Sequence, residues 1–280
     1  MANRKAIQYE DRLIAFVDLL GFKNAIDQSV NTDNKKEAIE IRERIKRIID
    51  NNELIQIFNE INKQVVTTVK KSEDGKKIEE PYSKFEISFF SDCFVISCPK
   101  DEKEQGKIYM EFFMGLTNLA IQVASIGFLL RGGITFGKLY HIGNKCFGPA
   151  MNRAYLLESK TADFPRIIVD AFAVKEVGSN SYGNKSMQFI GPDKTDGLMF
   201  LDYLSQKVYF KDNDNYHDFE GNRLDYNRFL KIIRNMIIED LIKFENDNKL
   251  LAKYQWYKEY YNDTIKKVLC QEQQDEFLIK

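Results

Sequence analysis

The strongest constraint on the fold is a continuous apolar run near the start of the chain, Leu13 to Phe22, interrupted only by one carboxylate and one glycine. A strand with one exposed face alternates apolar and polar residues, so an unbroken run predicts a strand buried on both faces. Asp18 lies inside this run, where an unpaired carboxylate is costly. We therefore expect Asp18 to be neutralised by a cation or by hydrogen-bond donors.

Gly21 ends the apolar run, and a helix is expected from Phe22 to about Gln28. The end of the strand then lies beside the free backbone N–H groups of a helix start, which bind anions. A carboxylate for a metal ion and donors for a phosphate would meet at this point. Asp18 alone does not establish such a site, because an aspartate at a strand end is often only a helix cap.

A second carboxylate follows between residues 84 and 97, where two strand-like runs meet at Ser91-Asp92. Two polar residues between hydrophobic runs are typical of a β-hairpin. If the hairpin lies beside the first strand, Asp18 and Asp92 converge at one edge of the sheet. The simpler alternative for Asp92 is an ordinary turn aspartate.

Composition narrows the class of protein. With 41 basic and 42 acidic residues in 280, the chain lacks the basic excess of a general nucleic-acid binder. Its four cysteines include no C-x-x-C pair, which predicts small core residues of a reducing compartment and neither disulfides nor a zinc site. No signal peptide or apolar segment of about 20 residues is found. We expect a cytoplasmic protein without a membrane or nucleic-acid partner.

The remaining pattern predicts an α+β fold, an α/β sandwich with a ferredoxin-like βαββαβ core and a helical insertion. After the first helix we expect a helix through Ala38 and Ile48, helical spacing from Leu54 to about Val69, and a loop at 70–83. The hairpin follows, and then a helix at about 102–126. The core ends with a bent strand or strand pair at 128–142, a helix from Pro149 and a strand at 165–170.

Further elements are expected after this core. Residues 171–210 predict a helix and short strands, and residues from about 224 to 269 predict two helices. We divide the chain into a catalytic domain at 10–205 and a helical C-terminal extension at 206–280. The extension is expected to pack on the domain or on a dimer partner.

Four segments, in order, resemble the motifs of the class III nucleotidyl cyclases. The run around Asp18 resembles the first metal motif and Ser91-Asp92 the second. Residues 131–137 are similar to an R-x-G-I-x-x-G strand, and residues 147–154 to the segment with a transition-state asparagine, here Asn152. The resemblance covers roughly residues 10 to 170, and four ordered motifs are far more specific than one.

The resemblance implies that Asp18 and Asp92 hold two divalent cations, manganese or magnesium, per site. Asn152, Arg131 and Arg153 are the catalytic candidates, because Leu156 stands where the family has a further arginine. The candidates for binding the nucleoside triphosphate are Leu19, Gly21, Phe22, Ser91 and Tyr155. We expect the backbone of Leu19, Gly21 and Phe22 to take part, and the rings of Phe22 and Tyr155 could stack on a base.

Two departures from the purine cyclases are Ser88 in place of a lysine and Lys145 in place of an aspartate that reads adenine. Residues 155–158 and 165–168 instead look like the pyrimidine cyclases of Pycsar antiphage systems. That resemblance implies formation of cyclic UMP, or next cyclic CMP, by a manganese-dependent homodimer with active sites at the interface and a separate effector protein. The alternatives are an adenylate or guanylate cyclase, an enzyme making linear oligonucleotides, and a catalytically silent nucleotide sensor.

Overall fold

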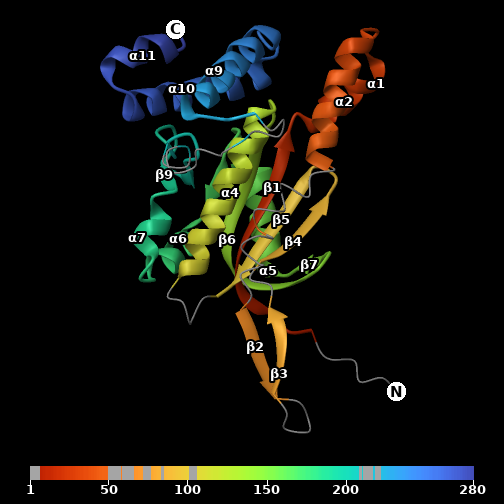
Figure 1. Ribbon diagram of the computed structural model, residues 1–280, viewed down its shortest axis with the longest axis vertical. Coiled ribbons are helices and arrows are strands. Elements are labelled where there is room, and N and C mark those ends of the chain that lie inside the picture. The colour runs from red at the N-terminus through yellow and green to blue at the C-terminus, as the bar shows by residue number, and fades with distance from the viewer. Residues whose placement is uncertain are drawn as a thin grey trace.

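The computed structural model describes residues 7–49, 58, 66–71, 77–82, 85–100, 106–207, 210, 217 and 222–280. A strand, two helices, a hairpin, a helix and a strand form its first part (Figure 1). These elements are β1 (Glu10–Leu20), α1 (Phe22–Asn31), α2 (Lys35–Ile49), β4 (Glu86–Phe90), β5 (Cys93–Pro99), α4 (Lys107–Ser125) and β6 (Leu129–Ile142).

The sheet has the strand order β4-β5-β1-β6-β8-β10-β9, with the short strand β7 (Lys145–Phe147) paired to β6. β1 lies antiparallel to both β5 and β6, and β4 forms a hairpin with β5. This order and these directions are those of the ferredoxin-like core, so the predicted α+β fold is confirmed. The added edge strands are β8 (Ile167–Val169), β9 (Ile190–Pro192) and β10 (Met199–Leu201).

The two faces of β1 pack into different cores, because successive side chains of a strand point to opposite faces. The odd-numbered residues belong to the larger core with α4, and the even-numbered residues pack with α5 (Pro149–Leu156). The first set is Leu13, Ala15, Val17 and Leu19, and the second is Ile14 and Phe16 with Ala150 and Ala154 of α5. The unbroken apolar run of β1 is thus buried on both faces, as predicted.

Two predicted segments between α2 and β4 are wrong where the structure describes them. The helical spacing was extended to Val69, but β2 is a strand over Val66–Lys71, and β3 (Lys77–Tyr82) lies within the predicted loop. β-branched residues such as Val66, Thr67 and Thr68 favour a strand over a helix, which the apolar spacing concealed. Residues 50–57 and 59–65 lie outside the described residues.

The other predicted elements agree more closely. Residues 129–142 form one continuous strand, and α5 begins at Pro149 as expected. After β8 come α6 (Ala171–Gly178) and α7 (Gly183–Met187), and η1 (Leu157–Thr161) is a π-helical turn between α5 and β8. The C-terminal helices are α9 (Tyr226–Lys243), α10 (Asn248–Val268) and α11 (Gln271–Phe277).

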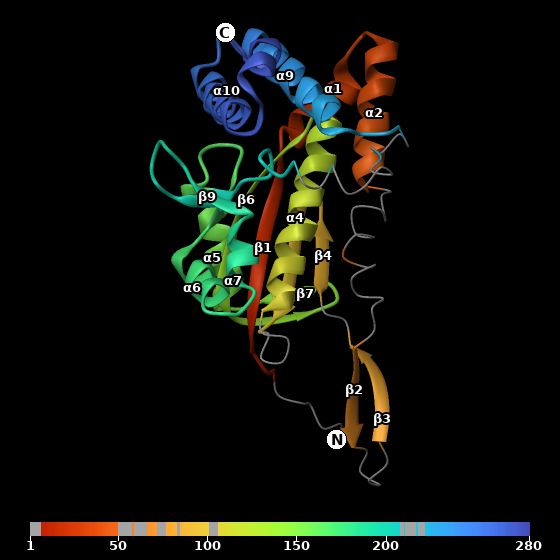
Figure 2. The ribbon, with the colours of Figure 1, turned by 60° about the vertical axis from the view of Figure 1, so that its left-hand side comes forward.

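α9 and α10 lie across the end of the sheet at which β1 runs into α1 (Figure 2). Their apolar faces are buried, with Phe229 and Ile233 of α9 and Tyr257 and Ile265 of α10 fully inaccessible to solvent. Among the described residues, no helix combines the length and the apolar composition needed to cross a bilayer.

Candidate metal and nucleotide site

Asp18 lies near the end of β1, on the same sheet face as Phe16. In the strand register it stands opposite Cys93 of β5 and Arg131 of β6. Directly after Leu20, the last residue of β1, Gly21 adopts a φ of 85°, a left-handed conformation that glycine tolerates, and α1 begins at the next residue. The sequence therefore turns the chain sharply just after the carboxylate.

Asp92 reaches the same place through the β4–β5 hairpin. Ser91 and Asp92 form the turn between the paired residues Phe90 and Cys93, and Ser91 has a φ of 55°. The backbone N–H of Leu19 donates a 3.0 Å hydrogen bond to the carbonyl of Asp92, which joins the turn to β1. The predicted convergence of Asp18 and Asp92 at one edge of the core is what the structure contains.

The two carboxylates and the thiol of Cys93 form a cluster whose ligand atoms all lie within 4.8 Å of one another. The Cys93 sulfur is 3.8 Å from an oxygen of each carboxylate. Burial, and then the nearby Asp92 carboxylate, raise the pKa of Asp18 to about 6. Burial and the same two carboxylates raise the pKa of Cys93 to about 12. A cation between these groups would offset the negative charge that, after burial, contributes to both raised pKa values.

Arg131 connects this cluster to the end of α5. Its Nη2 lies 3.4 Å from an oxygen of Asp18 and donates a short hydrogen bond to Glu158 of η1. The Glu158 side chain is only 6% exposed, so its charge depends on this arginine. The Nε of Arg131 is buried and lacks a hydrogen-bond partner among the described residues.

A cavity of about 330 Å³ opens beside Asp18 and Asp92. The backbone from Leu19 to Phe22 lines it, together with the first turn of α1. The first N–H groups of a helix have no partner inside the helix, and Gly21 provides no capping side chain. These donors can hold an anion, and phosphate binding here stays a prediction.

Other predicted site residues do not reach the carboxylates within one chain. Asn152 is exposed on α5 and does not line the cavity. α5 runs along β6 from Gly137, where an added Cβ would lie 3.6 Å from Ala150, toward Gly133, where it would lie 2.7 Å from the carbonyl of Ala154, and Asn152 lies between these two levels. Arg153 lies 3.7 Å from Asp170 and stacks over Phe172 at 3.9 Å.

Three further candidates occupy distinct environments. The ring of Phe22 is 3% exposed and packs in the main core against Phe128, which agrees with the alternative that an aromatic at such spacing is a core residue and not a stacking platform for a base. Only the backbone of Phe22 remains for a ligand. Tyr155 is half exposed with its ring edge-on to Phe16, and Ser91 is exposed in the hairpin turn.

Sequence reasoning missed several groups at the site. Cys93 was assigned to the core, although its place directly after Asp92 in a hairpin beside β1 puts it opposite Asp18. Glu158 lies in the segment 155–158 that resembles the pyrimidine cyclases, but no role for it follows from the sequence alone. The cavity is also lined by Asp240, Lys243 and Tyr254 of the C-terminal helices, which no local motif indicated.

Comparisons with known proteins were made at three levels. No family model matches the chain, and no curated protein matches it. Among solved structures, the guanylyl cyclase Cya2 is similar with a TM-score of 0.38 and 13% identity, over 69% of this chain and 91% of that one. The catalytic core of a rhodopsin-guanylyl cyclase with converted specificity, in complex with ATPαS, has a TM-score of 0.40 and 12% identity over 69% and 95%.

A class III adenylyl cyclase-like ATP-binding protein from Pseudomonas aeruginosa is similar over 84% of this chain and 44% of that one, with a TM-score of 0.42 and 11% identity.

Proposed function

We propose that this protein is a nucleotidyl cyclase that converts a nucleoside triphosphate into the 3′,5′-cyclic nucleotide and pyrophosphate. The observation that supports it best is the meeting of Asp18 and Asp92, from two separate motifs, beside the donors of a helix start. The order of the four motifs in the sequence agrees with this activity.

The donor set fits hard divalent cations. Asp18 and Asp92 offer carboxylate oxygens, which suit magnesium or manganese, and we propose that they hold two such ions with help from the carbonyl of Leu19. When bound, such cations promote loss of the ribose 3′-hydroxyl proton and neutralise phosphate charge. Burial, and then the charge of Asp92, raise the pKa of Asp18, and a cation would offset the second of these two effects.

The chain's own residues would bind and orient the substrate. In the reaction the 3′ oxygen loses its proton and forms a bond to the α-phosphorus, while the bond from that phosphorus to the pyrophosphate breaks. The N–H groups of Gly21 and Phe22 would hold the phosphates, and Arg131, whose Nη2 lies 3.4 Å from an Asp18 oxygen, would place its positive charge near the metal ligands. Asn152 and Arg153 would act at the transition state from another subunit.

A homodimer is proposed because one chain leaves Asn152 away from the carboxylates. The face of the sheet that α5 covers is only partly occupied, since α5 packs on β1 and β6 while Phe90 of β4 is 82% exposed on the same face. Exposed Tyr155 and Leu156 of α5 adjoin this area. A second copy seated there by a two-fold axis would form two equivalent sites at the interface.

The base is proposed to be uracil, or next cytosine, on the resemblance to the pyrimidine cyclases and on the loss of the purine-reading residues. Lys145 is exposed on β7, and Leu156 is exposed at the end of α5, where the family has an arginine. The proposed role is antiviral signalling through a separate effector that binds the cyclic nucleotide. A purine cyclase remains the alternative for the same fold and metal pair.

The test is a mass-spectrometric product assay with each of the four ribonucleoside triphosphates and manganese. We expect cyclic UMP or cyclic CMP from the wild type and none from Asp18→Ala or Asp92→Ala. Asp27→Ala, which removes an exposed carboxylate of α1, is the matched control and should keep wild-type turnover. Cyclic AMP or cyclic GMP would overturn the pyrimidine assignment, and undiminished product from either site variant would refute the metal pair.

A second candidate is a nucleotide sensor without turnover. It is favoured by the double pairing of Arg131 with Asp18 and Glu158 and by Leu156 at the arginine position. Metal-dependent nucleotide binding by a dimeric, folded sample that forms no product with any nucleotide would select the sensor.

A further inference from the structure

The cavity beside Asp18 and Asp92 is formed by two segments that are far apart in sequence. One side consists of residues 18–25 and Asp92, and the opposite side comes from α9 and α10, through Asp240, Lys243 and Tyr254. Figure 2 shows α9 lying beside the start of α1 and the end of β1. The C-terminal helices are therefore part of the wall of the candidate site.

Charge is distributed unevenly along this cavity. The carboxylates of Asp18 and Asp92 come from the β1 side, and the cations Lys23, Arg44 and Lys243 also line the cavity, together with the carboxylate of Asp240. A chain of phosphates with bound metal needs this arrangement, because the metal requires acidic ligands while the outer phosphates require cations and N–H donors.

Arg44 is a fixed part of the wall. Its Nε and Nη2 donate hydrogen bonds of 2.7 and 2.9 Å to the carbonyls of Ile126 and Gly127, and its guanidinium lies 4.9 Å from the ring centre of Phe128. Lys243, the last residue of α9, is exposed and has a long, mobile ammonium group that can follow a ligand. Lys243 is therefore the better candidate for direct contact.

Asp240 places a negative charge one helical turn from Lys243. Burial raises the pKa of Asp240, whereas a hydrogen bond from Tyr254 and the charges of Lys243 and Arg44 lower it. The charges of Lys243 and Arg44 therefore act on this carboxylate in the cavity wall. A phosphate would then compete with Asp240 for Lys243.

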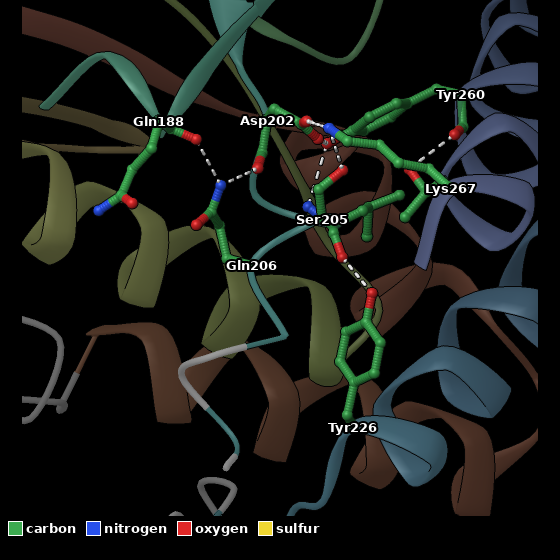
Figure 3. A network of polar contacts seen from close by, with 9 residues as sticks. Gln188, Asp202, Ser205, Gln206, Tyr226, Tyr260 and Lys267 are labelled. Atoms are coloured by element: carbon green, nitrogen blue, oxygen red, sulfur yellow. Dashed lines mark hydrogen bonds and ion pairs between the residues drawn. The ribbon is translucent and has the colours of Figure 1, made fainter. Parts of the chain in front are cut away.

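A polar network attaches the C-terminal helices firmly to the core (Figure 3). Asp202, just after β10, accepts hydrogen bonds of 2.9 Å from Tyr260 and 3.1 Å from Lys267, both on α10. The hydroxyl of Tyr226, on α9, donates 2.6 Å to the carbonyl of Leu204. Because α9 and α10 are both hydrogen-bonded to the segment that follows β10, the cavity wall that includes Lys243 has a defined position.

We propose that α9 and α10 complete the nucleotide site and that Lys243 binds the terminal phosphates of the substrate. The identity of the ligand as a nucleoside triphosphate rests on the proposed function, whereas contact between Lys243 and a polyphosphate does not. The C-terminal extension is then a binding element that selects triphosphates over shorter phosphate chains.

The probe is inorganic tripolyphosphate with magnesium, titrated calorimetrically into the full-length chain. We expect Lys243→Ala to weaken binding about tenfold and Lys243→Arg to restore it to within about threefold. Lys231→Ala removes another α9 lysine, which pairs with Glu276 outside the cavity, and should bind like the wild type. Equal affinity of Lys243→Ala and the wild type would overturn the proposal, as would absence of binding to the wild type.

Cyclic-nucleotide formation by the same samples separates this inference from the proposed function. Tripolyphosphate binding that depends on Lys243, in a chain that forms no cyclic product, would support phosphate binding by Lys243 and refute the proposed cyclase activity. Cyclic product with no effect of Lys243→Ala on binding would do the reverse. Unchanged thermal unfolding of Lys243→Ala would show that a loss of binding is local.

Discussion

The Cys93 thiol lies 3.8 Å from an oxygen of both Asp18 and Asp92, so it adds a soft donor to a pair of hard ones. Thiolates favour zinc and cadmium, whereas carboxylates alone suit magnesium and manganese. We expect Cys93→Ser to weaken cadmium binding about tenfold while leaving manganese affinity within about threefold of wild type. Isothermal titration calorimetry with each cation measures both affinities in the wild type and in the variant.

Cys146→Ser is the matched control, because Cys146 is also half-buried but lies away from the carboxylates. Equal cadmium affinity in Cys93→Ser and the wild type would show that the thiol is only a neighbour of the site.

A second residue, His141, is held neutral by a directed set of hydrogen bonds. Arg12 donates 2.9 Å to the hydroxyl of Ser97, whose oxygen lies 2.8 Å from His141 Nδ1. On the other side His141 Nε2 lies 2.8 Å from the hydroxyl of Ser88, which donates to the carbonyl of Gly143. This order matches a ring that accepts at Nδ1 and donates from Nε2.

Burial, and then the charge of Arg12, lower the pKa of His141 from 6.5 to about 4. The unfolded chain therefore binds the proton first as the pH falls, and folding stability is lost between these two values, by up to about 1.4 kcal/mol per pH unit. We expect His141→Gln to be less stable than wild type at pH 7 and to lose less stability between pH 7 and pH 5, measured by urea unfolding. His217→Gln should keep the wild-type slope, and an unchanged slope in His141→Gln would contradict the assignment.

Among individual residues, the sequence predicted those that a local pattern marks and missed those whose role depends on residues brought near by the fold. Asp18 and Asp92 stand out because a carboxylate inside an apolar run or a hairpin turn is conspicuous. Cys93 and His141 acquire their environments only from the pairing of β5 and β6 with β1 and β4. Lys243 lies at the site only because α9 packs beside the start of α1, and the apolar periodicity of the sequence does not predict how a distant helix packs.

Among the secondary-structure elements, β6 owes its close packing to two consecutive glycines. A Cβ on Gly133 would lie 2.4 Å from the Cβ of Leu157 and 2.7 Å from the carbonyl of Ala154, and a Cβ on Gly132 would lie 2.5 Å from the carbonyl of Phe16. Gly133 lets α5 and η1 lie close to one face of β6, and Gly132 admits the close contact with the neighbouring strand β1. The pair of Arg131 with Glu158 depends on that approach, because Glu158 follows Leu157 directly.

We expect Gly133→Ala to lower the free energy of unfolding by about 2–3 kcal/mol, because α5 and η1 must move to admit the methyl group. Gly137→Ala on the same strand is the control, since its Cβ would make an ordinary 3.6 Å contact with Ala150 and should cost less than about 1 kcal/mol. Chemical denaturation measures both variants. Equal losses would mean that the tight contact at Gly133 relaxes freely.

The elements were predictable where one pattern dominated. β1, α4 and α5 carry long apolar runs or a proline at the first helical turn, and the structure has them close to the expected bounds. β2 and β3 were misread because a charged hairpin lacks the apolar alternation of a strand in a packed sheet, and pairing between the two strands stabilises it instead.

For the whole molecule, the decisive feature is that one chain separates the two halves of the proposed site. Asp18 and Asp92 lie at the end of β1, while Asn152 is exposed on α5 on the same face of the sheet. A dimer that joins these halves contains two sites, each with carboxylates from one subunit and the asparagine from its partner. A site shared between two subunits can be restored by mixing two inactive variants, whereas a site contained in one chain cannot.

Asp18→Asn and Asn152→Ala should each be inactive alone, and mixing them after reversible dissociation should restore activity. Random pairing makes half of the dimers mixed, and each mixed dimer has one intact site of two, so we expect about a quarter of wild-type turnover. Asp18→Asn mixed with Asp92→Asn should stay inactive, because both changes fall in the same half of the site. Failure of the first mixture to recover, with both variants inactive alone, folded and dimeric, would show that Asn152 and the carboxylates act within one chain and would overturn the shared site.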